Sequence, residues 1–149
     1  MKYNRNLISA LRWLACLVLV AGLCGCRDGR PTRVPVSGRV LVDGEPLGQG
    51  HVRFVPEGAR PSGGILDTDG RFALTCYDGQ DGAVLGTHRV EVSASEIVGG
   101  GIRWHAPKKY NRFATSGLEV EIDGPTDDLE LNLTWDGGRP FTEPTEAEW

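Results

Sequence analysis

Apolar residues alternate with polar ones in short segments after residue 33, and many of the polar positions carry charged side chains such as Glu119 and Glu121. The apolar residues that share one face in each segment are Val34, Val36, Val40 and Val42; Val52 and Phe54; Phe72, Leu74 and Cys76; Val90 and Val92; Leu118, Val120 and Ile122; and Leu129, Leu131 and Leu133. A period of two is typical of strands with one face against a core and the other in water. With a short strand at residues 64–67, the pattern predicts seven strands within residues 34–135 and no sustained helix after residue 26.

Turn dipeptides separate these segments. Asp43-Gly44 directly follows the first predicted strand, and Asp69-Gly70 lies between two others. The same pair of residues recurs at positions 78–79, 81–82 and 123–124. Asp and Gly tolerate the left-handed backbone conformation that tight hairpin turns require. The turns and the alternation together predict an all-β protein, and seven strands in about 100 residues is the size of a β-sandwich.

The N-terminus carries a different pattern. Lys2, Arg5 and Arg12 precede or flank an apolar stretch of 11 residues from Trp13 to Leu23, and no acidic residue occurs before position 28. A basic start followed by a short apolar run is the layout of a secretory signal peptide. The run is too short for a permanent transmembrane helix, which needs about 20 apolar residues. We therefore expect residues 1–25 to be a signal peptide that is removed.

The apolar run ends in Leu23-Cys24-Gly25-Cys26, which resembles the lipobox of bacterial lipoproteins. The resemblance implies a diacylglyceryl thioether on the Cys26 sulfur and an acylated amino group, so that several acyl chains anchor the protein. Residues 26–33 would then be a lipidated tether, and the protein would be exported and anchored to the cell membrane. Arg27, not aspartate, follows the cysteine, which favours the outer membrane in a Gram-negative source. The alternatives are an ordinary secretory peptide cut near Gly25 and a buried apolar helix.

Processing changes the charge and the cysteine content. The chain has 16 basic and 20 acidic residues and a net charge of −4, and the loss of three basic residues with the signal peptide changes the net charge to −7. So negative a domain is not expected to bind nucleic acid through charge. Cys76 is the one cysteine left after cleavage and acylation, so no internal disulfide is expected. It continues an apolar face, which predicts a buried thiol; a reactive or intermolecular cysteine is the alternative.

Four segments combine these strands and turns in a familiar order. They are residues 36–47 (VSGRVLVDGEPL), 52–56 (VRFVP), 68–72 (TDGRF) and 86–92 (GTHRVEV). They resemble the carboxypeptidase regulatory-like domain, a transthyretin-like (prealbumin-like) fold, and more closely small bacterial lipoproteins with one such domain behind a lipobox. The resemblance implies a single seven-stranded transthyretin-like (immunoglobulin-like) β-sandwich over residues 34–135. It implies no established reaction, because in peptidases this domain is an accessory to a separate catalytic domain.

Residues 96–114 are the longest expected connection between strands. Three consecutive glycines make this segment flexible, and Trp104, His105 and Tyr110 give it aromatic surface beside basic side chains. Aromatic faces with polar neighbours suit sugars or protein partners, so these three residues are candidate ligand-binding residues. The alternative is that Trp104 and Tyr110 fold back and cap the core, as long loops often do.

The sequence contains no strong metal-binding pattern. Residues 67–70 (DTDG) resemble part of a calcium loop, but Arg71 and Phe72 occupy positions where an EF-hand needs a ligand and a glycine, so a β-turn is expected. Weak calcium binding by Asp78 and Asp81 with one of the earlier aspartates is the alternative. The three histidines are far apart and are expected on polar faces or in loops: His51, His88 and His105. No metal and no cofactor are expected.

Sequence motifs of catalysis are also missing. The chain has no nucleophile elbow and no phosphate-binding loop, and it lacks the Tyr-Arg-Gly-Ser ending of transthyretin-like hydroxyisourate hydrolases. We therefore expect a membrane-anchored envelope lipoprotein whose domain is a non-catalytic binding or structural module, with an envelope protein or a glycan as partner. The alternatives are a carbohydrate-binding accessory module that uses Trp104, Tyr110 and Trp135, and a transthyretin-like hydrolase. Residues 136–149 are acidic and without a strand pattern, which predicts a flexible tail.

Overall fold

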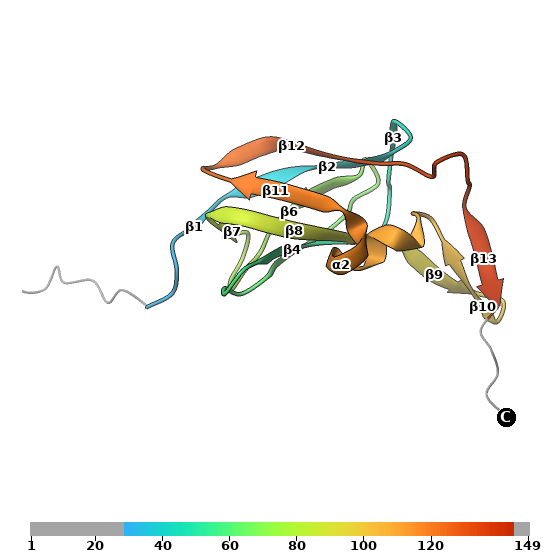
Figure 1. The fold of residues 1–149 in the computed structure, drawn as a ribbon, viewed down its shortest axis with the longest axis horizontal. Helices are drawn as coiled ribbons and strands as arrows, with labels where there is room; N and C mark the ends of the chain where they lie inside the picture. The colour runs from blue at the N-terminus through green and yellow to red at the C-terminus, as the bar shows by residue number, and fades with distance from the viewer. Residues whose placement is uncertain (1–28, 145–149) are drawn as a thin grey trace, which may run out of the picture. The chain divides into compact units, whose positions relative to one another are not determined.

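The computed structural model describes residues 29–144, which are mostly β-structure. The strands are β1 (Arg33–Val34), β2 (Val36–Val42), β3 (Glu45–Pro46), β4 (His51–Pro56), β5 (Ser62–Ile65), β6 (Arg71–Ala73), β7 (Ala83–Val84), β8 (Gly86–Ser93), β9 (Ser95–Val98), β10 (Gly101–Trp104), β11 (Leu118–Ile122), β12 (Thr126–Leu133) and β13 (Phe141–Pro144). A 3-10 helix, η1 (Lys108–Asn111), and one short α-helix, α2 (Phe113–Ser116), lie between β10 and β11 (Figure 1). Neither has the length and apolar character that crossing a membrane requires, and no other helix occurs among the described residues. The expected signal peptide, Cys26 and the last five residues of the chain lie outside the described residues.

Two sheets form the main body of the domain. One sheet has the order β11-β8-β4-β5, and each pair of neighbours is antiparallel. In the other sheet, β2 pairs with β12 in parallel and with β3 and β6 in antiparallel. Each of the seven predicted segments contains a strand, namely β2, β4, β5, β6, β8, β11 and β12. The ends differ in three places: β5 begins and ends earlier than predicted, β6 ends at Ala73, before Leu74 and Cys76, and Val34 belongs to the separate strand β1. The prediction of a mostly β protein is therefore confirmed.

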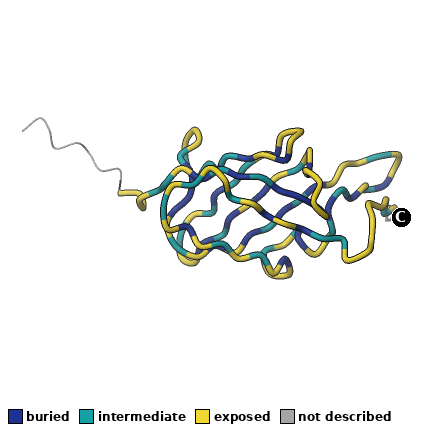
Figure 2. Tube along the Cα trace, turned by 90° about the horizontal axis from the view of Figure 1, so that it is seen from above, coloured by how far each residue is buried: buried dark blue, intermediate teal, exposed yellow. Residues whose placement is uncertain are grey.

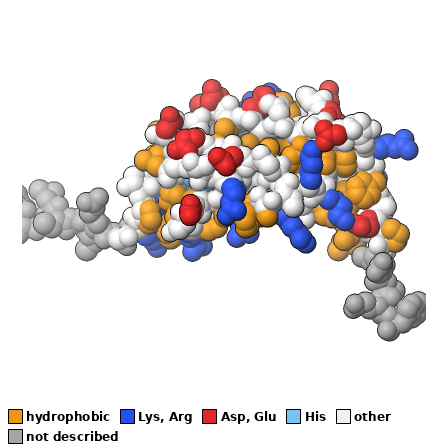
Figure 3. All heavy atoms as spheres, viewed as in Figure 1, with side chains coloured by type: hydrophobic (Ala, Val, Ile, Leu, Met, Phe, Trp, Pro, Cys, Tyr) orange, Lys and Arg blue, Asp and Glu red, His pale blue; other side chains and the backbone are white. Residues whose placement is uncertain are grey.

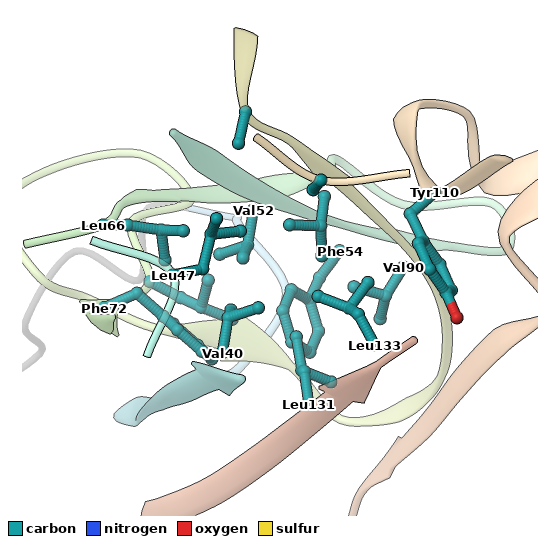
Figure 4. Packing of buried hydrophobic residues seen from close by; sticks show 14 of the residues in the cluster. Val40, Leu47, Val52, Phe54, Leu66, Phe72, Val90, Tyr110, Leu131 and Leu133 are labelled. Atoms are coloured by element: carbon teal, nitrogen blue, oxygen red, sulfur yellow. The ribbon is translucent and has the colours of Figure 1, made fainter. Parts of the chain in front are cut away.

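The side chains that point inward from both sheets pack in one core. Buried and exposed residues alternate along the strands, as Figure 2 shows, because successive side chains of a strand point to opposite faces. Val40 and Leu131 come from one sheet, and Phe54 and Val90 come from the other. Phe54 is fully buried and lies among these residues in Figure 4. The alternation read from the sequence thus locates the core.

The predicted turn after β2 is also present. Asp43 has a φ of 50° and Gly44 a φ of 88°, and Val42 and Glu45 are paired on either side. Positive φ at both central positions matches the reversal favoured by Asp-Gly in a two-residue hairpin. The local sequence is sufficient to place this reversal.

A third, three-stranded sheet lies at one end of the domain, and the sequence pattern did not predict it. Its order is β13-β10-β9, with both pairs antiparallel. Part of the segment expected as a long connection therefore forms a hairpin, β9 and β10. Part of the tail expected to lack strands forms β13, which runs along β10 with Trp104 opposite Phe141. The pairing of β13 with β10 joins distant segments, which short alternation does not reveal, whereas β9 and β10 are consecutive strands joined at Gly99 and Gly100.

The opposite end of the domain carries β1, which pairs with β7. From there β8 begins directly after β7 and leads along the main sheet to β9. Likewise β2 begins directly after β1 and ends at Val42, beside the turn to β3. At about 3.3 Å per residue, the seven residues of β2 separate β1 from that turn by about 23 Å. The chain thus enters the domain at one end, and β3, β9, β10 and β13 lie toward the other (Figure 1).

Candidate functional site

Trp104, the first candidate ligand-binding residue, is buried at the end of β10 with 8% of its surface exposed. Its indole Nε1 donates a hydrogen bond to Glu143 Oε2 on β13, at 3.2 Å. Lys108 Nζ donates to both oxygens of the same carboxylate, at 3.0 and 2.8 Å, and lies 5.3 Å from the centre of the indole ring. The hydrogen bonds from Lys108 and then from Trp104 lower the pKa of the Glu143 carboxyl. Glu143 of β13 thus holds Trp104 in place.

Tyr110 is buried in the core and has 5% of its surface exposed. Its hydroxyl accepts a hydrogen bond from the backbone amide of Thr134, at 3.2 Å. Lys109 Nζ lies 4.8 Å from the centre of the ring and donates to Asp136 Oδ2. Both aromatic rings of the predicted site therefore pack as the capping alternative describes, and neither offers an open face for a sugar to stack on.

His105 is the candidate residue that remains accessible. Its side chain is 25% exposed, and its Nε2 lies 2.9 Å from Glu96 Oε1 on the neighbouring strand β9. The backbone amide of His105 donates to the carbonyl of Ala94, which lies between β8 and β9, so the backbone at His105 is held in place. The structure therefore places His105 at the surface and Trp104 and Tyr110 in the packed interior.

A groove of about 420 Å³ brings His105 together with a residue from a distant part of the chain, Trp135. We call it the Trp135 groove; its lining residues include Glu45, Pro46, Gln49 and Pro140. The indole of Trp135 packs edge-on against Phe141, with ring centres 6.3 Å apart, and the Trp135 amide donates to the Asp43 carboxylate in the β2–β3 turn.

An apolar groove with a few polar side chains can hold a small ligand or a peptide side chain. Sequence reasoning named Trp135 for only one alternative function. The sequence showed only a tryptophan just after the end of a predicted strand. No sequence feature near Trp135 indicated that it would lie beside His105.

Comparison with known proteins identifies no relative from which a function could be inferred. No protein-family model, curated protein or solved structure matches the chain. We therefore infer function from the residues themselves and from their positions in the fold.

Cys76 occupies the position that the alternation predicts. It is a free thiol with 4% of its surface exposed, and its Sγ lies 3.6 Å from the carbonyl oxygen of Arg60. The prediction of a buried thiol is confirmed. A thiol with so little accessible surface is protected from oxidants and from pairing with another chain.

Two of the aspartates considered as calcium ligands, Asp67 and Asp81, accept hydrogen bonds from backbone amides. Asp67 Oδ1 accepts hydrogen bonds from the amides of Asp69 and Arg71, at 2.9 and 2.8 Å, which forms the expected turn before β6. Asp81 Oδ1 accepts from the amide of Cys76 at 2.7 Å, and Asp81 Oδ2 pairs with Arg33 Nε at 2.8 Å. Within residues 29–144, no group of three or more His, Cys, Asp or Glu side chains is arranged to hold a metal ion.

The hydrogen bonds of Asp81 predict a stability effect that depends on pH. Partial burial alone would raise the pKa of Asp81, but hydrogen bonds from the amides of Cys76, Tyr77 and Asp78 and the charge of Arg33 lower it below its ordinary value of 3.8. Because the folded-state pKa is the lower one, the stabilisation is complete above pH 3.8 and is lost as the pH falls through the folded-state value.

We expect Asp81→Asn to lower the free energy of unfolding by about 1–3 kcal/mol at pH 7. Denaturant unfolding of both proteins across the acid range should show the difference shrinking below pH 3.8. Asp69→Asn is the control, because the Asp69 side chain is exposed in the turn before β6, and it should change stability by less than about 0.5 kcal/mol. A loss for Asp81→Asn that is the same at every pH would contradict the role of its charge.

One histidine differs from its predicted environment. His88 was expected on a polar face or in a loop, but it is fully buried, with its ring 6.0 Å from that of Phe54. Its Nε2 lies 2.8 Å from the carbonyl oxygen of Val84. The reason is the period of two, since residue 88 is in phase with the inward-facing Val90 and Val92. His88 is therefore a residue of the core and is not accessible to a metal ion at the surface.

Proposed function

We propose that this protein is an exported lipoprotein, acylated on Cys26, whose domain is a non-catalytic binding or structural module of the cell envelope. The observation that carries the proposal is the sequence Leu23-Cys24-Gly25-Cys26 at the end of a short apolar run with a basic start. Signal peptides share the first two features, and the cysteine in the lipobox position adds the anchor.

The fold supports the finer part of the proposal, a seven-stranded transthyretin-like sandwich over residues 34–135. The seven predicted strands occur in two sheets that share one core. Their order along the chain is the order of the segments that resemble the carboxypeptidase regulatory-like domain. The three-stranded sheet β13-β10-β9 is an addition at one end.

The position of the Trp135 groove is consistent with a module that binds a partner away from the membrane. Residues 27–32 between Cys26 and β1 span at most about 21 Å when fully extended. The groove lies beside the end of β2, about 23 Å along that strand from β1. In an anchored domain, β1 is therefore the end attached to the tether, and the Trp135 groove lies away from that attachment.

Replacement of the lipobox cysteine tests the anchor. We expect the full-length chain, expressed in a bacterial host with labelled palmitate, to incorporate the label and to partition into the detergent phase. Cys26→Ser removes the acceptor sulfur, so the label should be lost completely. Labelling and the mass of the product are measured together.

Cys24→Ser is the matched control, since it changes a neighbouring thiol in the same segment and should leave labelling intact. Cys76→Ser provides a second control inside the folded domain. Incorporation of label into Cys26→Ser, or its loss in Cys24→Ser alone, would show that Cys26 is not the acylated residue.

A further inference from the structure

A second groove lies on the side of the domain, between β4 and the segment that leads into β5. It has a volume of about 760 Å³, which is within the range of ligand-binding sites. We call it the Arg53 groove. Its lining residues include His51, Arg53, Arg60, Gly63 and Gly64.

The charge of the Arg53 groove is opposite to that of the chain. Arg53 and Arg60 line the groove and none of the described residues that line it is acidic, whereas the whole chain has a net charge of −4. Figure 3 shows a related asymmetry on one face, where acidic side chains gather over β11 and β12 and basic ones lie mainly along the lower side of the view. A positive groove on a negative protein attracts an anionic ligand selectively.

Arg53 has donors available for such a ligand. Its side chain is 52% exposed, and its contact with Glu91 Oε1 is long, at 3.4 Å. A guanidinium has five N–H donors, so this contact leaves most of them unused. In the register of the sheet Arg53 lies opposite Gly63, which has no side chain to cover the guanidinium.

Arg60 faces the groove in a different way. Its guanidinium lies 5.0 Å from the centre of the Tyr77 ring. Stacking on an aromatic face fixes the plane of a guanidinium and leaves its N–H donors free at the edge. There they can form a bidentate pair of hydrogen bonds with a carboxylate. Arg53 on β4 and Arg60 before β5 therefore offer two carboxylate-binding groups along one groove.

The remaining lining residues favour a peptide over a sugar. Ile65 is 83% exposed and lies opposite His51 in the sheet, so it offers an apolar contact beside the basic groups. No aromatic ring is among the described lining residues, so the groove has no platform of the kind on which sugars stack. Gly63 has no side chain on this face, and a β-carbon there would meet only the carbonyl oxygen of Val52, at 3.6 Å, so a ligand can approach the strand closely at this position.

We propose that the Arg53 groove binds an extended peptide segment of a partner protein that carries alternating acidic and apolar residues. Arg53 and Arg60 bind the carboxylates, and Ile65 contacts an apolar side chain. The proposal concerns a surface that does not include Cys26 or the Trp135 groove, so it stands or fails independently of the lipid anchor.

The test uses the full-length chain in detergent micelles and a blocked peptide of alternating glutamate and valine residues. We expect saturable binding, with shifts of the Gly63 and Gly64 amide resonances. The same peptide with glutamine in place of glutamate should bind at least tenfold more weakly. Arg53→Gln and Arg60→Gln should each weaken binding about tenfold, which corresponds to about 1.4 kcal/mol.

Arg103→Gln is the matched control, because Arg103 is an exposed arginine of β10 outside the groove and its replacement should leave affinity unchanged. The thermal midpoints of the variants establish that each is folded. Equal affinity for the glutamine peptide, equal effects of all three arginine changes, or tighter binding of a uronic acid oligosaccharide than of the acidic peptide would each overturn the proposal.

Discussion

Phe54→Ala is expected to lower the free energy of unfolding by about 3–5 kcal/mol. Phe54 has no exposed surface and packs between the two main sheets, with ring centres 5.9 Å from Phe72 and 6.0 Å from His88. Truncation removes apolar contacts with both sheets and leaves a cavity, and the strands around it are held by their hydrogen bonds and can close it only in part. Denaturant unfolding followed by tryptophan fluorescence measures the loss.

Ile97→Ala is the control for this change, because Ile97 is also a large apolar residue of a strand but is 83% exposed. It should alter stability by less than about 0.5 kcal/mol. Since a small domain is stable by only about 5–15 kcal/mol, Phe54→Leu provides a milder variant with an expected loss of under about 1.5 kcal/mol if Phe54→Ala does not fold. A loss of under 1 kcal/mol for Phe54→Ala would mean that Phe54 is not at the centre of the core.

The second large effect is expected at Gly38, where β2 and β12 approach most closely. A β-carbon at this position would lie 2.0 Å from the carbonyl oxygen of Leu129 and 2.8 Å from its Cβ. The two strands run in parallel, and their register shifts between Thr126 and Leu129. Because the nearest atom in the way, the carbonyl oxygen of Leu129, belongs to the backbone, Gly38→Ala forces the strands apart. We expect a loss of at least the 1–3 kcal/mol typical of overpacking.

Hydrogen exchange distinguishes this mechanism from a general loss of stability. The amides of β12 should lose protection in Gly38→Ala more than those of β8, which pairs with β4 and β11. Gly124→Ala is the matched control, since its β-carbon would have no atom within 4 Å. Uniform loss of protection in both sheets, or an equal effect of Gly124→Ala, would argue against a local clash at Gly38.

Much of the main body could be predicted from the sequence because its signal is local. The inward positions of Val90 and Val92 follow from a period of two, and the same period also placed His88 in the core, although a histidine there was expected at the surface. The buried thiol of Cys76 followed from the alternation of Phe72 and Leu74. Val90, Val92 and His88 needed only the geometry of one strand, whereas Cys76 lies beyond the end of β6, where its amide donates to Asp81.

The candidate sites could be predicted less well. The sequence singled out Trp104, His105 and Tyr110 as neighbours in one segment, but Trp104 is held by Glu143 and Tyr110 by the backbone of Thr134. The Trp135 groove combines residues from near β3 with His105 and Trp135. Proximity along the chain was therefore a poor guide to which aromatic rings remain accessible.

Local alternation and turn chemistry were sufficient to determine that this protein is mostly β, where seven strands lie, which faces are apolar and where the β2–β3 turn reverses the chain. The resemblance of residues 23–26 to a lipobox is likewise a feature of the sequence alone, and the acylation of Cys26 stays a prediction. The pairing of β13 with β10, the close approach of Gly38 to Leu129 and the two grooves emerged only in three dimensions. Each of them joins segments separated by tens of residues, and such contacts depend on how whole sheets pack, which a short stretch of sequence does not encode.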